Sequence, residues 1–134
     1  MDTFSELAEH VEGRFNVVHR EKFMLCIELR TEGTRRQSVF LAELKDSDDR
    51  RILRLETAVS PLAHHDPVKV LRINLTLRGG YLAVGDLEGV PFLKLCDNLD
   101  FRYLSAEALD DRLERLGRLG DVIEDMLTHG HDYF

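Results

Sequence analysis

Apolar and polar residues alternate with a period of two over several short stretches in the first half of the chain. In Phe23–Leu29 the odd-numbered residues are all apolar, which is typical of a strand with one buried face. Arg51–Val59 alternates in the same way. Gln37–Leu44 is apolar on both sides at its centre and predicts an inner strand, and Asn16–His19 is a candidate for a further short strand. Turn residues at Glu32–Thr34 separate the first two strands.

Helical spacing of apolar residues marks the two ends of the chain. Near the N-terminus, Thr3 and Glu6 have the spacing of a capping box, and Gly13 is a stop signal. Near the C-terminus, Ser105 is the predicted N-cap of a long helix. Gly120 lies inside the apolar stripe of that helix, where it would allow a close approach to the sheet. The predicted stripes are Phe4, Leu7, Ala8 and Val11 in the first helix, and Leu109, Leu113, Leu116, Gly120, Ile123 and Leu127 in the last.

The segment Asp66–Arg78 fits two structures. Its leucines and isoleucine alternate with polar residues from Leu71 to Leu77, as in an amphipathic strand. The borders favour a helix, because an aspartate followed by proline is a start signal and Gly79-Gly80 is a stop. We therefore predict a helix that packs on the sheet.

This predicted helix has two apolar stripes, and a helix with two apolar faces must bury both. We expect one stripe, made of Val68, Leu71 and Leu75, to cover the chain's own sheet. The opposite stripe, made of Val70, Ile73 and Leu77, is then left for a partner. It is the predicted interface of a homodimer.

Two more strands, Tyr81–Val84 and Val90–Leu95, flank a glycine-bounded hairpin loop. The predicted order is helix, three strands, helix, two strands and helix (α-β-β-β-α-β-β-α). Antiparallel strands with helices on one face give the α+β class. At 134 residues the chain is expected to form a single domain, 1–134.

Charge and cysteine content restrict the partners and the location. The net charge of −7 disfavours nucleic acid and an anionic membrane, and it favours a protein partner with basic or apolar surface. Cys26 and Cys96 lie in apolar runs and are expected to be buried free thiols. The sequence has no signal-peptide pattern at its start and no apolar run near the ~20 residues of a membrane span, so we expect a cytoplasmic protein.

Two stretches carry a resemblance to a known family. Val70–Val84 runs from a leucine-rich helix with an internal asparagine through glycines into a strand, and Gly120–Leu127 closes the last helix. This pattern, over about residues 23 to 127, resembles the type III secretion chaperone-like superfamily, which includes the class I secretion chaperones and the YbjN-type bacterial family. The resemblance implies a homodimer built by the middle helix or a neighbouring strand, and binding of a client protein. No feature of this sequence identifies a client.

The residues that suggest chemistry have simpler explanations. His64-His65-Asp66 could hold a metal, but adjacent histidines need a third ligand from elsewhere, and the aspartate is a helix cap. His129–Asp132 is expected to be a polar tail. Cys26 has no nearby cation or helix N-terminus that would activate it as a nucleophile. The acidic residues Asp46, Asp48 and Asp49 are expected to form a turn. The arginine pairs Arg35-Arg36 and Arg50-Arg51 are expected to be charges that flank strand ends. We predict no catalytic, cofactor or metal site.

The sequence therefore predicts a small acidic protein-binding module, a homodimeric chaperone or adaptor that binds a segment of a client protein. One alternative is a regulatory subunit of a larger complex. The other is a small-ligand-binding or enzymatic domain. An enzyme needs a concave site with convergent polar groups, whereas a binding module needs an exposed apolar patch.

Overall fold

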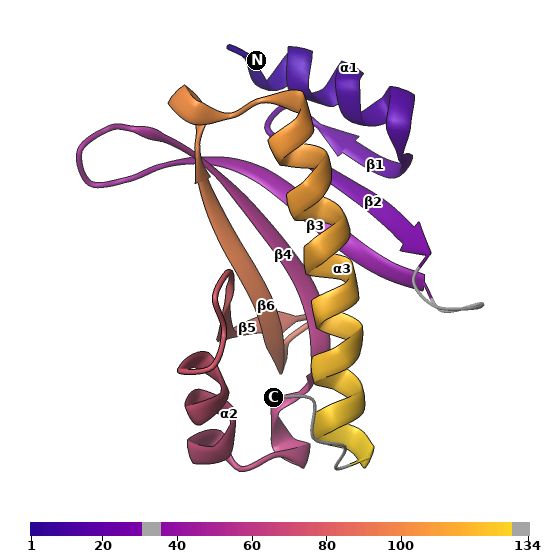
Figure 1. Cartoon of the computed structure of the whole chain (residues 1–134), viewed down its shortest axis with the longest axis vertical. Coiled ribbons are helices and arrows are strands. Elements are labelled where there is room, and N and C mark those ends of the chain that lie inside the picture. Colours follow the sequence, from indigo (N-terminus) through magenta and orange to yellow (C-terminus); the bar gives the residue numbers. More distant parts are fainter. Residues whose placement is uncertain (31–35, 130–134) are drawn as a thin grey trace.

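A computed structural model of the chain describes residues 1–30 and 36–129. In this part of the chain, six strands form one sheet and three α-helices pack against it (Figure 1). The elements are α1 (Phe4–Arg14), β1 (Asn16–Glu21), β2 (Met24–Arg30), β3 (Arg36–Lys45), β4 (Arg51–Pro61), η1 (Leu62–His64), α2 (Pro67–Asn74), β5 (Tyr81–Leu87), β6 (Val90–Asp100), η2 (Phe101–Tyr103) and α3 (Ala106–His129). The predicted α+β class is confirmed. The turn predicted at Glu32–Thr34 lies outside the described residues.

The candidate strand at Asn16–His19 is present as β1, and it extends to Glu21. Four strands therefore precede α2, and the predicted element order is one strand short. β1 pairs with β2, and the register of that pair shifts between Val17 and His19. The other predicted strands are all present within a few residues of their expected bounds.

All neighbouring strands are antiparallel, in the order β1-β2-β3-β4-β6-β5. The order departs from the sequence order at β6, because the β5–β6 hairpin returns beside β4 after α2. β4 and β6 are both 11 residues long and pair with each other inside the sheet. β1 and β5 are its two edges. α2 therefore lies in the connection that leads to an edge strand.

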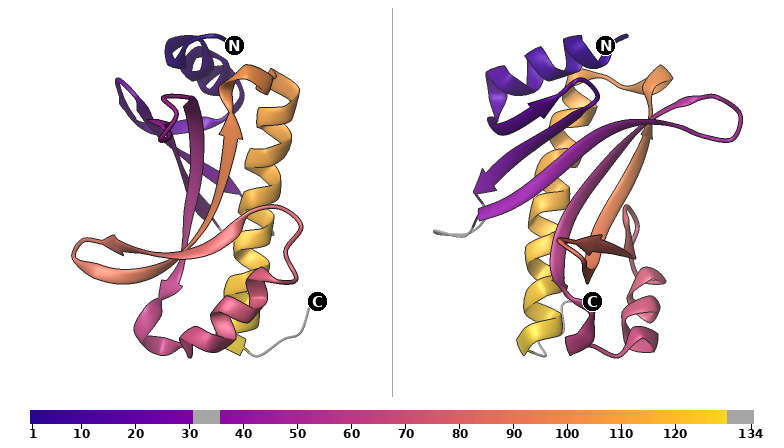
Figure 2. Two further views of the ribbon diagram at one scale, coloured as in Figure 1. Left: turned by 90° about the vertical axis from the view of Figure 1, so that its left-hand side faces the viewer. Right: turned by 180° about the vertical axis from the view of Figure 1, so that it is seen from behind.

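One hydrophobic core joins the sheet to the three helices. α3 runs along one face of the sheet, while α1 lies at one end of the molecule and α2 at the other (Figure 2). On the sheet, the alternate residues Leu53, Leu55 and Val59 of β4 are buried toward this core. The buried residues of α3 are Leu109, Leu113, Leu116, Gly117, Gly120 and Ile123. The buried residues of α1 are Phe4, Leu7, Ala8 and Val11, as the sequence predicts.

Both predicted N-caps at the ends of the chain are confirmed. The Thr3 hydroxyl accepts the backbone N–H of Glu6 at 3.1 Å, and the Ser105 hydroxyl accepts that of Ala108 at 3.1 Å. Each bond satisfies an amide that has no partner within its own helix. These short-range bonds fix where α1 and α3 begin.

Gly120 allows the close approach of α3 that the sequence suggests. A Cβ atom at this position would lie 3.1 Å from Cγ2 of Thr57 and 3.3 Å from Nε2 of Gln37. These distances are shorter than ordinary van der Waals contacts. A larger residue would therefore push α3 away from β3 and β4.

Candidate protein-binding surface

α2 begins where the sequence predicts. The Asp66 carboxylate accepts a backbone N–H of the first turn at 3.0 Å, and Pro67 occupies the first turn. The helix is shorter than predicted and ends at Asn74. There the backbone amide and the hydroxyl of Thr76 donate to the carbonyl oxygen of Ile73, at 2.9 and 2.7 Å, and close a turn.

The two apolar stripes of α2 have exchanged the roles that we expected. Val70 is 4% exposed and Ile73 is 9% exposed, and Leu77 packs against the core. The assignment of the faces was therefore wrong. Val70 and Ile73 belong to the chain's own core and Leu77 packs against it, so this stripe is not the face of α2 that is directed at solvent.

The outward stripe of α2 consists of Val68, Leu71 and Leu75, which we call the α2 stripe. Their exposed fractions are 56%, 63% and 74%. At spacings of three and four residues they share one face, and each is apolar at a position where polar or charged residues are usual. The stripe is an aliphatic surface directed at solvent.

The charged residues of α2 do not identify the outward face by themselves. At about 100° per residue, Arg72 lies about 40° from Val68 of the outward stripe, whereas Lys69 lies about 40° from Ile73 of the inward stripe. Both charged side chains are exposed. Because burying an unpaired charge is costly, each cation favours solvent exposure of the stripe beside it, and the two signals disagree.

Asn74 fixes the orientation of α2 against the edge of the sheet. Its Nδ2 donates to the carbonyl oxygen of Leu82 at 3.2 Å, and its Oδ1 accepts the Leu82 N–H at 2.6 Å. Because β5 is an edge strand, these two Leu82 groups point away from β6 and would otherwise face solvent. The paired bonds tie α2 to β5 with one particular face outward. Sequence reasoning noted this asparagine only as part of a family resemblance.

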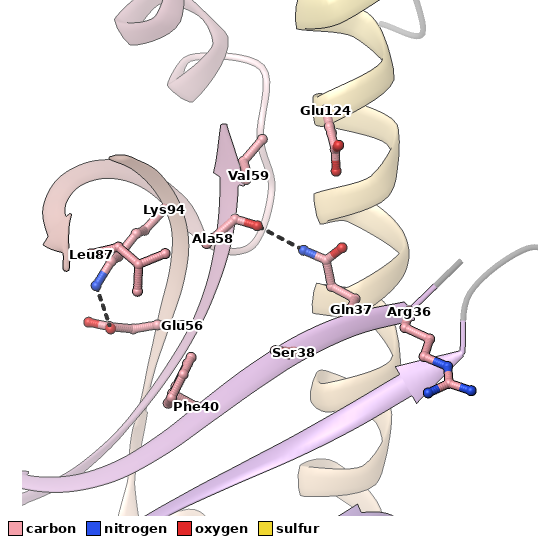
Figure 3. Close-up of a pocket in the computed structure, with 10 residues that line it drawn as sticks. All are labelled: Arg36, Gln37, Ser38, Phe40, Glu56, Ala58, Val59, Leu87, Lys94 and Glu124. Atoms are coloured by element: carbon pink, nitrogen blue, oxygen red, sulfur yellow. Dashed lines mark hydrogen bonds and ion pairs between the residues drawn. The ribbon is translucent and has the colours of Figure 1, made fainter. Parts of the chain in front are cut away.

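A cavity of about 400 Å³ lies where β3 and β4 diverge (Figure 3). Pairing of these strands begins at Phe40 and Glu56. On the far side of that pair, Nε2 of Gln37 donates to the carbonyl oxygen of Ala58 at 3.0 Å and to the hydroxyl of Thr57 at 2.6 Å. The described lining residues are Arg36, Gln37, Ser38, Phe40, Glu56, Ala58, Val59, Leu87, Lys94 and Glu124.

The polar groups of this cavity are largely engaged with one another. Nζ of Lys94 lies 3.6 Å from a carboxylate oxygen of Glu56, as the dashed line in Figure 3 marks. A guanidinium nitrogen of Arg36 lies 3.6 Å from a carboxylate oxygen of Glu28. Among the described lining residues there is no histidine or cysteine, and Ser38 supplies the hydroxyl. These residues do not assemble a nucleophile with a general base.

His64, His65 and Asp66 do not converge on a common point. Nε2 of His65 lies 2.7 Å from the hydroxyl oxygen of Ser60, and its ring centroid is 6.2 Å from that of His64. Burial lowers the pKa of His65, with smaller contributions from His64 and Lys69. Asp66 caps α2. Among the described residues, no group of three or more metal-ligating side chains comes together.

The two cysteines are free and buried, as the sequence predicts. Burial, assisted by Glu56, raises the pKa of Cys96 to about 11. Burial also raises the pKa of Cys26, with a smaller contribution from Glu28. Both thiols therefore stay protonated at neutral pH, which is the opposite of an activated nucleophile.

The remaining charged groups have structural roles. The Asp46 carboxylate accepts the backbone N–H groups of Asp48 and Arg50 at 2.8 and 2.9 Å, which confirms the predicted turn. Arg51 pairs with Glu43 at 2.7 Å and lies over the ring of a buried phenylalanine. His129, which was expected to begin a polar tail, is instead the last residue of α3 and pairs with Asp125 at 2.8 Å. Residues 130–134 and Arg35 lie outside the described residues.

Comparison of the chain with protein-family models, curated proteins and solved structures finds no match. The resemblance to the type III secretion chaperone-like superfamily therefore stays a prediction. No helix among residues 1–30 and 36–129 is both long and apolar enough to cross a bilayer. The feature that bears most directly on function is thus the α2 stripe on an α+β scaffold.

Proposed function

We propose that this chain is a protein-binding module, an adaptor or chaperone-like protein, and that its contact surface is the α2 stripe. The observation that supports the proposal is the exposure of Val68, Leu71 and Leu75 on one helical face. Single exposed apolar residues are common on protein surfaces, but three on one short helix form a patch. Contiguous apolar patches of this kind are typical of binding sites.

The size of the stripe limits what it contributes to binding. Fully burying an aliphatic side chain contributes about 1.5 to 3 kcal/mol, and these three are already partly buried. Association itself costs at least about 4 kcal/mol. The stripe therefore serves as the apolar centre of an interface, and polar contacts around it must add to the affinity.

The proposal allows two kinds of protein partner, a second copy of the chain and a client protein. If the homodimer predicted from the sequence forms through α2, its contacts must involve Val68, Leu71 and Leu75. The original assignment to Val70, Ile73 and Leu77 would require the core to open. A cytoplasmic location remains part of this proposal.

The test compares partner capture by three tagged forms of the full chain. Leu71→Asp places a charge in the α2 stripe. Tyr103→Asp changes a residue of η2 that is 77% exposed, and it serves as the matched control. Both variants are first checked for wild-type circular dichroism and thermal stability. Captured proteins are quantified by mass spectrometry, and self-association is measured by sedimentation.

We expect wild type and Tyr103→Asp to retain the same partner, or the same dimer, and Leu71→Asp to lose it. The expected loss is on the order of tenfold or more, because a carboxylate in the centre of an apolar contact is left unpaired. A partner profile and a sedimentation coefficient that are identical in all three forms would show that the α2 stripe is not a binding surface.

A further inference from the structure

We infer that the segment that docks on the α2 stripe is acidic and amphipathic, with aliphatic side chains flanked by Asp or Glu. This inference rests on the proposed function, and it adds the chemistry of the partner. It follows from the charges that surround the stripe.

The sequence around the stripe has a charge opposite to that of the whole chain. Between residues 62 and 80 there are three basic residues, Lys69, Arg72 and Arg78, and one acid, Asp66. With the histidines neutral, this segment carries +2, while the whole chain carries −7. The rest of the chain therefore carries −9. The single acid already accepts a backbone N–H at the start of α2.

The three cations around the stripe have no acidic partner within the described part of the chain. None of Lys69, Arg72 and Arg78 has a carboxylate oxygen within 4.0 Å there. Most of the other described lysines and arginines do have one. Arg78 instead contacts backbone, since its Nη1 lies 3.5 Å from the carbonyl oxygen of Leu75 and 3.4 Å from that of Thr76. An aliphatic face bordered by cations without carboxylate partners is complementary to an aliphatic face bordered by carboxylates.

The cations also lie on a defined side of the stripe. Lys69 and Arg72 are three residues apart and follow one flank of α2, whereas Asn74 lies on the other flank and is bound to β5. Arg78 follows the end of the helix. A docked segment would therefore place its carboxylates on the side away from β5. On the β5 side it needs apolar or uncharged residues.

The same charges disfavour other occupants of the stripe. Two α2 helices that pair antiparallel about a twofold axis would bring their cationic flanks to the same side, and like charges in an interface cost affinity. An anionic membrane would attract the cations of α2 but repel the strongly acidic remainder of the chain. A protein segment that carries its own carboxylates meets neither obstacle.

The experiment uses two synthetic helical peptides as probes. Both carry leucines at positions i, i+3, i+4 and i+7, and the flanking residues are glutamate in one peptide and lysine in the other. Binding of the fluorescein-labelled peptides to the full chain is measured by anisotropy at low and high salt. The variants are Lys69→Glu combined with Arg72→Glu, and a control with the same charge change at exposed positions elsewhere, Lys45→Glu combined with Arg115→Glu.

We expect the glutamate peptide to bind at least about tenfold more tightly than the lysine peptide, and we expect added salt to weaken its binding. The Lys69→Glu/Arg72→Glu variant should reverse the preference, and the control variant should keep it. Equal binding of the two peptides, or a preference that the Lys69→Glu/Arg72→Glu variant leaves intact, would overturn the inference.

Two further measurements test the other possible occupants of the α2 stripe, a membrane and a second copy of the chain. Flotation with phosphatidylserine-containing vesicles tests a membrane, and binding that is lost in Leu71→Asp would replace our inference with a lipid surface. A wild-type dimer that dissociates in Leu71→Asp would make a second copy the occupant and would also overturn it. Both results refute only the acidic partner. The proposed protein-binding role itself fails only if Leu71→Asp changes neither partner capture nor self-association.

Discussion

Gly120 and Gly13 both lie in helices but have opposite surroundings. At Gly120, a Cβ atom would meet Thr57 and Gln37 at 3.1 and 3.3 Å. Those two side chains are joined to each other by a 2.6 Å hydrogen bond and cannot move independently. At Gly13, near the end of α1, a Cβ atom would meet nothing within 4 Å. Glycine is therefore required by packing at one position and not at the other.

Alanine substitution at the two glycines should change stability in opposite directions. Gly13→Ala should raise the free energy of unfolding by up to about 1 kcal/mol, because alanine has the better helix propensity. Gly120→Ala should lower it by about 1 to 3 kcal/mol, since overpacking outweighs the same propensity gain. Urea unfolding followed by circular dichroism measures both values. A stabilised Gly120→Ala variant would mean that α3 is free to shift away from the sheet.

At the scale of elements, α2 is the part of the fold whose orientation matters most for function. Its buried face holds Val70 and Ile73, and its outward face holds Leu71. The two bonds from Asn74 to the edge strand hold that orientation. Turning α2 about its axis so that the other stripe faced solvent would bury Arg72 and break these bonds.

Aspartate substitutions on the two faces of α2 test this orientation. Ile73→Asp should lower the free energy of unfolding by about 3 to 5 kcal/mol, because it removes buried apolar contacts and buries a carboxylate. Leu71→Asp should change it by no more than about 0.5 kcal/mol, because that side chain is already in water. Thermal and urea unfolding distinguish the two. Equal effects at both positions would contradict the orientation of α2 described here.

At the scale of the whole molecule, the reaction rates of the two cysteines can show whether the sheet unfolds in one step or in parts. One row of directly opposed residues crosses from β2 to β6: Cys26 faces Phe40, Phe40 faces Glu56, and Glu56 faces Cys96. The two thiols thus lie on different sides of the sheet's middle. Both are buried, and burial raises the pKa of each.

Both thiols should react slowly with a disulfide reagent at pH 8, and at the same rate when each becomes accessible only through opening of the whole sheet. The pKa of Cys96, near 11, alone lowers its thiolate fraction by about 100-fold relative to a free cysteine, and burial adds to this. The stability that the protonated thiol provides is present below the ordinary cysteine pKa and is lost as pH rises toward 11. Mild denaturant should accelerate both reactions equally. If one cysteine reacts much faster in dilute buffer, the sheet opens in parts.

Much of the local structure could be predicted from the sequence. Thr3, Asp66 and Ser105 mark three helix starts, because a cap acts over two or three residues and its signal is contained in the adjacent sequence. Period-two alternation identified the strands for the same local reason. The α+β class followed from the order of these elements. The acidic net charge was also visible without the fold.

Tertiary structure alone decided which side of α2 faces solvent. Val70 and Leu71 are both aliphatic, and local sequence gives them the same preference for burial. The choice depends on the contacts between Asn74 and Leu82, and on the cost of burying Arg72. It could not be derived from periodicity, because an apolar period locates a stripe but does not identify what covers it. The proposed binding surface could therefore be located only when the sheet and the helix were placed together.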